Sequence, residues 1–255
     1  MANAKHELDV FSLEPVEVYQ LVLDGTLKKF PMYYLDKIKC KTILRYVVLE
    51  KYKYSREDIL KLNRNFLSEN KMGGFKNFFD TQIYKMLSYS FPELEIKPWE
   101  LTKVYPNYWK DKDNQKEFVL WVAEKEGLDL NSKQDLRKLT ADVIQRYGGS
   151  KPLVHSGGEY ELLKSVTGDE YKEWEIIAIS SWSKEKAIEA VKWLVEERLK
   201  ITLEQACDLK TSDFMENNLD GMLQKAFKHS ILAALNAAYP NKFIREGSRG
   251  IKFIG

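Results

Sequence analysis

Histidine and cysteine are the residue types that would first indicate metal binding or nucleophilic catalysis. The 255-residue chain has only three histidines and two cysteines. Zinc sites need such ligands at short, regular spacings or beside acidic partners. No pair has that spacing, so the sequence predicts no metal site and no cofactor. The residues are His6, His155, His229, Cys40 and Cys207.

The stretch "GGSKPLVHSGGE" contains a histidine next to a serine, which suggests a hydrolase. A nucleophile elbow has glycine two positions before the serine and follows a strand. Val154 stands two before Ser156, and no strand pattern precedes it. The stretch also lacks the GxxxxGK[ST] order of a phosphate-binding loop. We expect no enzymatic activity, and a hydrolase centred on Ser156 and His155 is the least favoured hypothesis.

Basic side chains near the end of the chain suggest contacts with phosphate. With 40 basic and 38 acidic residues, the net charge is +2, so a nucleic-acid site must be a local patch. The simpler alternative is that these lysines only solvate the outside of helices. We expect phosphate contacts at Lys225, Lys228, Arg245 and Arg249, with His229 at a helix joint near the backbone or a base edge, and thinner counterparts at Lys76, Lys85 and Lys164.

The elements that would position these residues recur three times. An offset of 148 places Phe79 on Phe227, and an offset of 75 places Asp80 and Thr81 on His155 and Ser156. The starts of the copies align Tyr34, Trp109 and Trp182. Further aromatics, Tyr46, Trp121 and Trp193, recur inside amphipathic runs, where they are expected to pack in the core rather than stack on bases.

Helix boundaries recur with the copies. Each amphipathic run is followed by a hydroxyl residue with an acceptor three positions later, the pattern of a capped helix start. A glycine follows, where we expect a turn with positive φ. The capping pairs are Ser55 with Asp58, Ser132 with Asp135, and Thr202 with Gln205, and the glycines are Gly73, Gly148 and Gly221.

These signals predict an all-α fold of three modules, each with a long helix, a short capped helix, a turn and two short helices. Before them, "SLEPVEVYQLVLDGTLKKF" predicts a helix with Pro15 in its first turn and Gly25 past its end. It would cap the first module. The expected division is a capping helix at 1–29, a first module at 30–104, a middle module at 105–178 and a last module with a basic tail at 179–255.

The composition fits a globular protein of the reducing cytoplasm. Hydrophobic residues make up 44% and charged residues 31% of the chain. No apolar run follows the N-terminal charges and none is long enough to span a bilayer, so we expect neither a signal peptide nor a membrane segment. The two cysteines are expected to be buried thiols rather than a disulfide.

The chain resembles a family of tandem-repeat domains of unknown function from Gram-positive bacteria and their phages. The resemblance rests on "EVYQLVLDGTLKKFP", "ALNAAYPNKF" and the endings "KPWE" and "KEWE". The family has no established chemistry. The last module has Gly247 where Trp99 and Trp174 end the other two, which suggests that this aromatic serves the junction to a following module.

A looser resemblance points to DNA. "MLQKAFKHSILAALNAAYP" is similar to the helical DNA-binding repeats that accompany homing endonucleases, although Lys228 and His229 depart from the joint of that pattern. The leading hypothesis is therefore a non-catalytic nucleic-acid-binding protein, DNA rather than RNA, with a regulatory or phage-related role. The alternative is an adaptor or inhibitor whose helical array binds another protein, with "GGSKPLVHSGGE" as an exposed recognition loop. The residues that match the homing-endonuclease-associated repeats in type are Phe227, Ser230, Ala234, Leu235 and Ala238.

Overall fold

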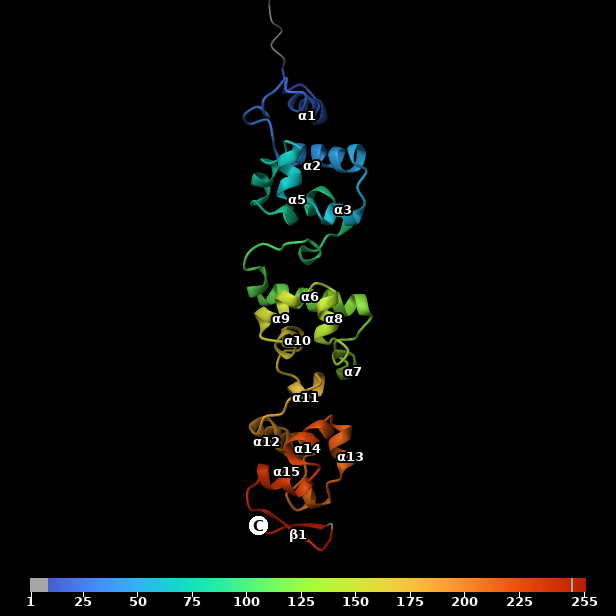
Figure 1. Ribbon diagram of the computed structural model, residues 1–255, viewed down its shortest axis with the longest axis vertical. Coiled ribbons are helices and arrows are strands. Elements are labelled where there is room, and N and C mark those ends of the chain that lie inside the picture. Colours follow the sequence, from blue (N-terminus) through green and yellow to red (C-terminus); the bar gives the residue numbers. More distant parts are fainter. Residues whose placement is uncertain (1–8, 249) are drawn as a thin grey trace, which may run out of the picture. The chain divides into compact units, whose positions relative to one another are not determined.

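The computed structural model describes residues 9–248 and 250–255, and most of them are helical (Figure 1). The all-α prediction is confirmed. A small antiparallel hairpin, which the sequence did not predict, pairs β1 (Phe243–Glu246) with β2 (Gly250–Phe253). Within the described part of the chain, no helix combines the length and the apolar character needed to cross a membrane.

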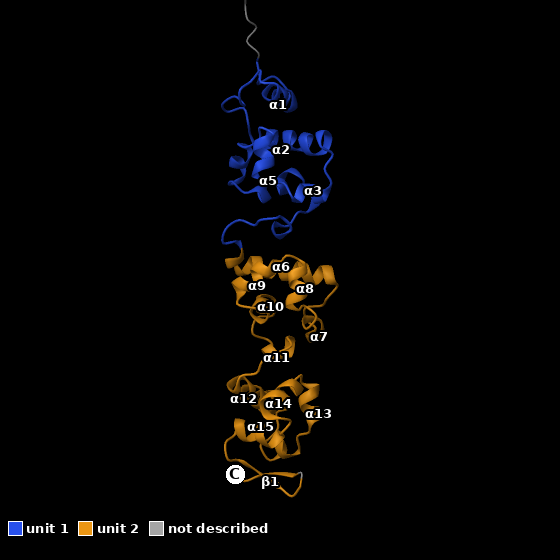
Figure 2. Ribbon diagram, in the orientation of Figure 1, with its two compact units in different colours: residues 1–108 blue, residues 109–255 orange. Residues whose placement is uncertain are grey.

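The chain folds into two compact units that divide between Tyr108 and Trp109 (Figure 2). One compact unit can hold two modules, so the division into a capping helix and three modules stays a prediction. A short 3₁₀ turn, Tyr108–Lys110, contains the division between the units.

In the first unit, α1 (Pro15–Leu23) begins with the expected proline and is followed by Gly25 at φ +85°. Its Tyr19 is fully buried, and its hydroxyl donates to the carbonyl of Asn70 at 3.1 Å. The ring of Tyr19 meets that of Tyr46 edge-on, with 6.5 Å between centroids. These contacts fasten α1 to the first module.

The first module is built on one long helical segment. Asp36 caps its start by accepting a bond from the amide of Lys39 at 2.8 Å, and Ile43 and Leu44 on its inner side are fully buried. The helices of this unit after α1 are α2 (Lys37–Arg45), which continues as a π-helical turn (Tyr46–Lys51), α3 (Arg56–Leu60), α4 (Arg64–Glu69), a 3₁₀ helix (Phe75–Phe79), α5 (Ile83–Ser90) and two 3₁₀ turns (Pro92–Leu94, Pro98–Glu100).

The second unit repeats this order of elements twice. Its helices are α6 (Lys112–Glu126), α7 (Lys133–Leu136), α8 (Ala141–Arg146), α9 (Ser150–Ser156), α10 (Glu159–Thr167), α11 (Glu173–Ile176), α12 (Lys184–Lys192) with a π-helical turn (Trp193–Arg198), a 3₁₀ helix (Gln205–Asp208), α13 (Thr211–Glu216), α14 (Asp220–Phe227) and α15 (Ile231–Ala238).

Each module contains, after its short capped helix, a helix that the sequence did not predict. The segments α4, α8 and α13 are each six residues long and lie where a plain turn was expected. A helix of fewer than two turns shows too little periodicity to stand out in a sequence, and isolated helices of this length are unstable in water. Tertiary packing must therefore hold these three segments, and each buries a large apolar side chain in the core. These side chains are Leu67, Ile144 and Phe214.

The predicted pairs are hydrogen-bonded in all three modules, reciprocally in the first and the last, whereas Asp135 accepts the amide of Asp129. Ser55 and Asp58 form a reciprocal capping box at the start of α3. Ser132 caps α7 by accepting a bond from the amide of Asp135 at 3.3 Å. The amide of Thr202 donates to Gln205, and the amide of Gln205 donates back to the Thr202 hydroxyl.

The predicted positive-φ glycines are correct at one position and wrong at two. The residue that takes positive φ is the second one after α4, α8 and α13, and it is Lys71, Gly148 and Asn218 in turn. At this residue the chain reverses, and the next amide bonds back to a helix carbonyl, as Gly149 does to Ile144 at 3.0 Å. Gly73 lies two residues further on, and Gly221 lies inside α14, neither with positive φ.

The two cysteines are free thiols, as predicted. Cys40 is 1% exposed, and its burial raises the pKa of its thiol to about 12. Cys207 is partly buried, and desolvation also raises its pKa. Both side chains are therefore protonated near neutral pH, where thiols are poor nucleophiles.

Alanine substitutions at Gly148 and Gly221 should have effects of opposite sign. Gly148→Ala places a Cβ at φ +84° and should destabilise the second unit by about 1 kcal/mol. Gly221→Ala lies in a helix with nothing within 4 Å of the new Cβ and should stabilise by about 0.5 to 1 kcal/mol. Urea unfolding followed by tryptophan fluorescence measures both, because five of the six tryptophans lie in this unit. Shifts of the same sign would contradict the assignment of the turn to Gly148.

Candidate functional site

The joint between α14 and α15 contains the two basic residues that the sequence singled out. Lys228 and His229 both adopt left-handed conformations, with φ of 50° and 61°. Their amides bond back to Gln224 and Leu223 at 3.1 and 3.0 Å, which closes α14, and Ser230 then caps α15. Both side chains are exposed, and neither forms a hydrogen bond or ion pair with another described residue.

The same pair of left-handed residues occurs before α5 in the first module and before α10 in the middle module. Asp80 and Thr81 form it in the first module, with φ of 50° and 60°. Gly157 and Gly158 form it in the middle module, with φ of 98° and 127°. The sequence alignment placed His155 and Ser156 at this joint, which is wrong by two residues, because α9 continues through Ser156.

The stretch "GGSKPLVHSGGE" is not an exposed recognition loop, and that prediction is wrong. Its centre forms α9. Pro152 fits there because it lies in the first turn, where backbone amides have no partner within the helix. Leu153 is buried, and the Ser156 hydroxyl lies 3.1 and 3.0 Å from the carbonyls of Leu153 and Gly158. The hydroxyl therefore bonds to main-chain carbonyls at the end of α9, and no hydrogen bond joins it to His155 in the described structure.

The first-module joint is closed by an ion pair. The Asp80 carboxylate lies 2.7 Å from the Lys85 ammonium on α5, and this bond lowers the pKa of Asp80 and raises that of Lys85. An offset of 148 relates the two joints, so Lys228 and Ala233 occupy the positions of Asp80 and Lys85. The last module therefore has a basic residue where the first has an acidic one, and an alanine where the first has the basic partner.

Most of the other predicted phosphate contacts have partners within the protein. Lys225 donates to the carbonyl of Ser180 at 2.9 Å, and Arg245 donates to the carbonyl of Ser248 at 3.1 Å. Lys164 pairs with Asp169 at 2.7 Å, which raises the pKa of the lysine. Lys76 is half-buried on the 3₁₀ helix that precedes the first-module joint, and its carbonyl accepts the amide of Thr81 at 2.9 Å. Arg249 and His6 lie outside the described residues.

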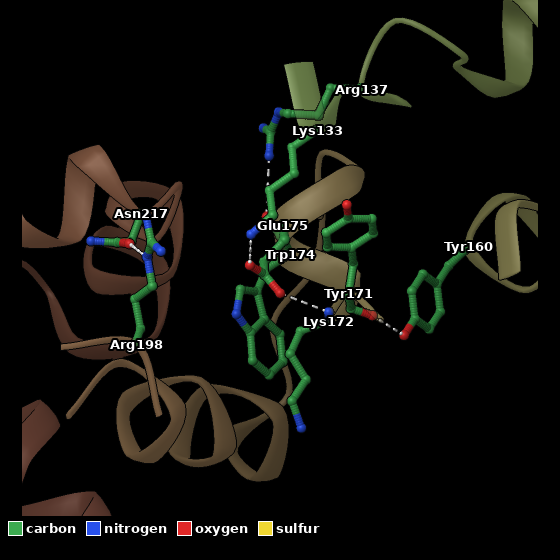
Figure 3. A network of polar contacts seen from close by, with 9 residues as sticks. All are labelled: Lys133, Arg137, Tyr160, Tyr171, Lys172, Trp174, Glu175, Arg198 and Asn217. Carbon is green, nitrogen blue, oxygen red and sulfur yellow. Dashed lines mark hydrogen bonds and ion pairs between the residues drawn. The ribbon is translucent and has the colours of Figure 1, made fainter. Parts of the chain in front are cut away.

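A second polar cluster, missed by sequence reasoning, surrounds α11 (Figure 3). Glu175, only 8% exposed, accepts the amide of Lys172 at 2.9 Å and forms an ion pair with Lys133 on α7. Arg137 donates to the carbonyl of Trp174 at 3.1 Å. These bonds fix α11 to the second helix of the middle module and orient Trp174.

The Trp174 ring extends from this cluster into the core of the last module. Its centroid lies 6.1 Å from that of Trp182 and 5.6 Å from that of Trp193. The ring is 3% exposed, and its indole N–H is buried with no hydrogen-bond partner. The expectation that this aromatic serves the junction to a following module is confirmed for Trp174.

The anchor of this cluster recurs in the first unit. Glu100 accepts the amide of Lys97 at 2.8 Å and binds the Arg56 guanidinium at 2.9 and 3.0 Å. Arg56 directly follows the cap Ser55, as Lys133 directly follows the cap Ser132. In both units, the basic residue after a serine cap therefore pairs with the glutamate of the anchor, Glu100 or Glu175. In the last module the corresponding residue is Leu203, and β2 packs on the 3₁₀ helix Gln205–Asp208.

No group of three histidine, cysteine or acidic residues in the described structure could hold a metal ion.

A family model described as "Protein of unknown function (DUF4046)" matches residues 16–96. This part of the chain, from α1 to just past α5, therefore has the pattern of a domain of unknown function, and the expected resemblance is confirmed to that extent. No curated protein and no solved structure matches the chain.

Removing the buried carboxylate of the α11 cluster should weaken the second unit. Glu175→Gln removes the charge that Lys133 neutralises, and we expect a loss of about 1 to 2 kcal/mol in the free energy of unfolding. The control Glu189→Gln removes an exposed partner 3.8 Å from Lys172 and should cost less than about 0.5 kcal/mol. Equal losses in the free energy of unfolding by urea would show that the Glu175 contact stabilises the protein no more than the exposed ion pair does.

Proposed function

We propose that this chain is a non-catalytic nucleic-acid-binding protein that prefers DNA to RNA, and that the joint Lys228–His229 contacts the phosphate backbone. The proposal depends on one observation: a strained turn has two basic, exposed side chains that no other described residue pairs with. Left-handed backbone costs an ordinary residue about 1 to 2 kcal/mol, and such strain persists where surrounding structure compensates for it. The middle module makes the same turn with Gly157 and Gly158, so the turn itself needs no side chain there.

The comparison of the two non-glycine joints supports a role outside the fold. The Asp80 carboxylate pairs with the Lys85 ammonium, whereas Lys228 has no such partner in the described part of the chain and stays available to an anion. A lysine of this kind is a mobile point charge suited to phosphate. The side chains of Lys225, Arg245, Lys85 and Lys164 contribute less in this proposal, because their bonds within the protein compete with phosphate.

The resemblance to homing-endonuclease-associated repeats favours DNA among the nucleic acids. It covers α14, the joint and α15, which is the segment that contains Lys228 and His229. The resemblance to repeat domains of Gram-positive bacteria and their phages favours a regulatory or phage-related setting. Both likenesses support the proposal as analogies of sequence pattern.

The experiment replaces the joint side chains without disturbing the turn. The double variant Lys228→Gly with His229→Gly keeps a backbone that glycine adopts freely. Its affinity for a fluorescent 20-base-pair duplex should fall by about tenfold at about 50 mM salt, and the slope of log affinity against log salt should become shallower by about one. Fluorescence anisotropy over a salt series measures both.

The control is Asn218→Gly, which also relieves a left-handed residue of the last module but removes no basic group. It should leave the affinity unchanged. Undetectable binding of the unmodified protein at 50 mM salt, or equal affinity of the joint variant, would refute the proposed function.

A further inference from the structure

A hollow of about 430 Å³ adjoins the joint in the last module. Its walls come from the start of α12, the end of α14 and one side of α15, and they contain an indole and a phenyl ring. Phe227, the last residue of α14, directly precedes Lys228. The residues that line the hollow are Trp182, Lys184, Ala226, Phe227, Ala233 and Ala237.

The corresponding place in the first module is filled by that module's own side chains. The offset of 148 that relates the joints also relates α5 to α15, so Phe79 corresponds to Phe227 and Tyr89 to Ala237. The Tyr89 ring lies 5.5 Å from the ring of Phe79. Phe78 likewise stands where the last module has Ala226. The last module thus keeps the inner ring, Phe227, but has alanine in place of the tyrosine that would cover it.

The charge around the hollow favours an anionic ligand. Among the described residues, the only charged one in its lining is Lys184, which is exposed. Lys225 is bonded to the carbonyl of Ser180, two residues before Trp182, which brings a second ammonium group to this side of the module. Lys228 follows Phe227 and has no partner among the described residues. The hollow therefore combines aromatic walls with cations, and no described residue brings a carboxylate into its lining.

We propose that the hollow binds an unpaired nucleobase, stacked beside Phe227 and Trp182, while Lys184 and Lys228 contact the adjoining phosphates. This inference rests on the proposed function and adds single-stranded segments to the duplex that the joint contacts. A base within a duplex is stacked and paired, so it enters a hollow only after flipping out. Aromatic side chains together with a basic surface are the usual means of binding single strands without sequence preference.

The test fills the hollow with the side chain that the first module has at this place. Ala237→Tyr should lower the affinity for a fluorescent 12-nucleotide single strand by about tenfold, the effect of losing one stacked base. The affinity for a duplex of the same length should stay unchanged, because the joint remains intact. Ala237→Ser leaves the hollow open and should bind both ligands as the unmodified protein does.

A second measurement does not depend on the folding of any variant. The unmodified protein is titrated with a 12-nucleotide strand whose bases are replaced by abasic sites, which keep every phosphate. Loss of about tenfold in affinity relative to the normal strand supports the base in the hollow. Equal affinity of the unmodified protein for the two strands overturns this inference, and so does equal affinity of Ala237→Tyr and the unmodified protein for the normal single strand. In either case, the proposed function stands if duplex binding still weakens on substitution of Lys228 and His229.

A different pattern would assign the hollow to a protein. If neither single strand nor duplex binds, the proposed function fails. If in addition a peptide with an aromatic residue among acidic ones binds the unmodified protein but not Ala237→Tyr, the hollow belongs to a protein partner and the nucleobase proposal is wrong.

Discussion

The fold depends on tight reversals between helices that are too short to be stable alone. Segments of four to nine residues lie well below the length at which an isolated helix persists in water. In each module, left-handed residues connect these segments at two places: one residue lies after α4, α8 or α13, and two residues lie before α5, α10 or α15. At both places, amides bond back to the preceding helix, so the turn ends one helix and aims the next. The apolar side chains then meet in a core because the turns set their directions.

This arrangement separates the geometry of a joint from the residues that occupy it. The same backbone is made by Asp80 and Thr81, by Gly157 and Gly158, and by Lys228 and His229. Packing and the bonds of the main chain therefore specify the conformation, and the exposed side chains are free to differ. The first joint uses this freedom to form an ion pair with its own final helix, whereas the last joint presents two basic groups to solvent.

Sequence reasoning succeeded where the signal was local and failed where it required partners distant in the chain. The capping pairs, Pro15 and the all-α class follow from neighbours within a few residues, and the structure contains all of them. Positive φ was assigned by residue type, so Lys71 and Asn218 were missed, because tertiary packing compensates there for the strain of a side chain. The contact of Glu175 with Lys133 joins positions 42 residues apart, and no periodicity reveals it. Its only sequence signal is a basic residue after the cap together with a glutamate after the tryptophan.

The candidate site shows the same limit, because a list of basic residues does not say which of them are already used. Lys225, Lys164 and Lys85 looked equivalent to Lys228 in sequence, yet each has a partner at 2.9 Å or less. What distinguishes Lys228 is that two positions changed together relative to the first module, Asp80 to lysine and Lys85 to alanine. The alanine that removes the competing charge, Ala233, also lines the hollow beside Phe227. Ala233 thus leaves Lys228 without a partner of the Lys85 kind, and Ala237, in place of Tyr89, leaves the hollow uncovered. These two alanines of α15 link the joint to the hollow.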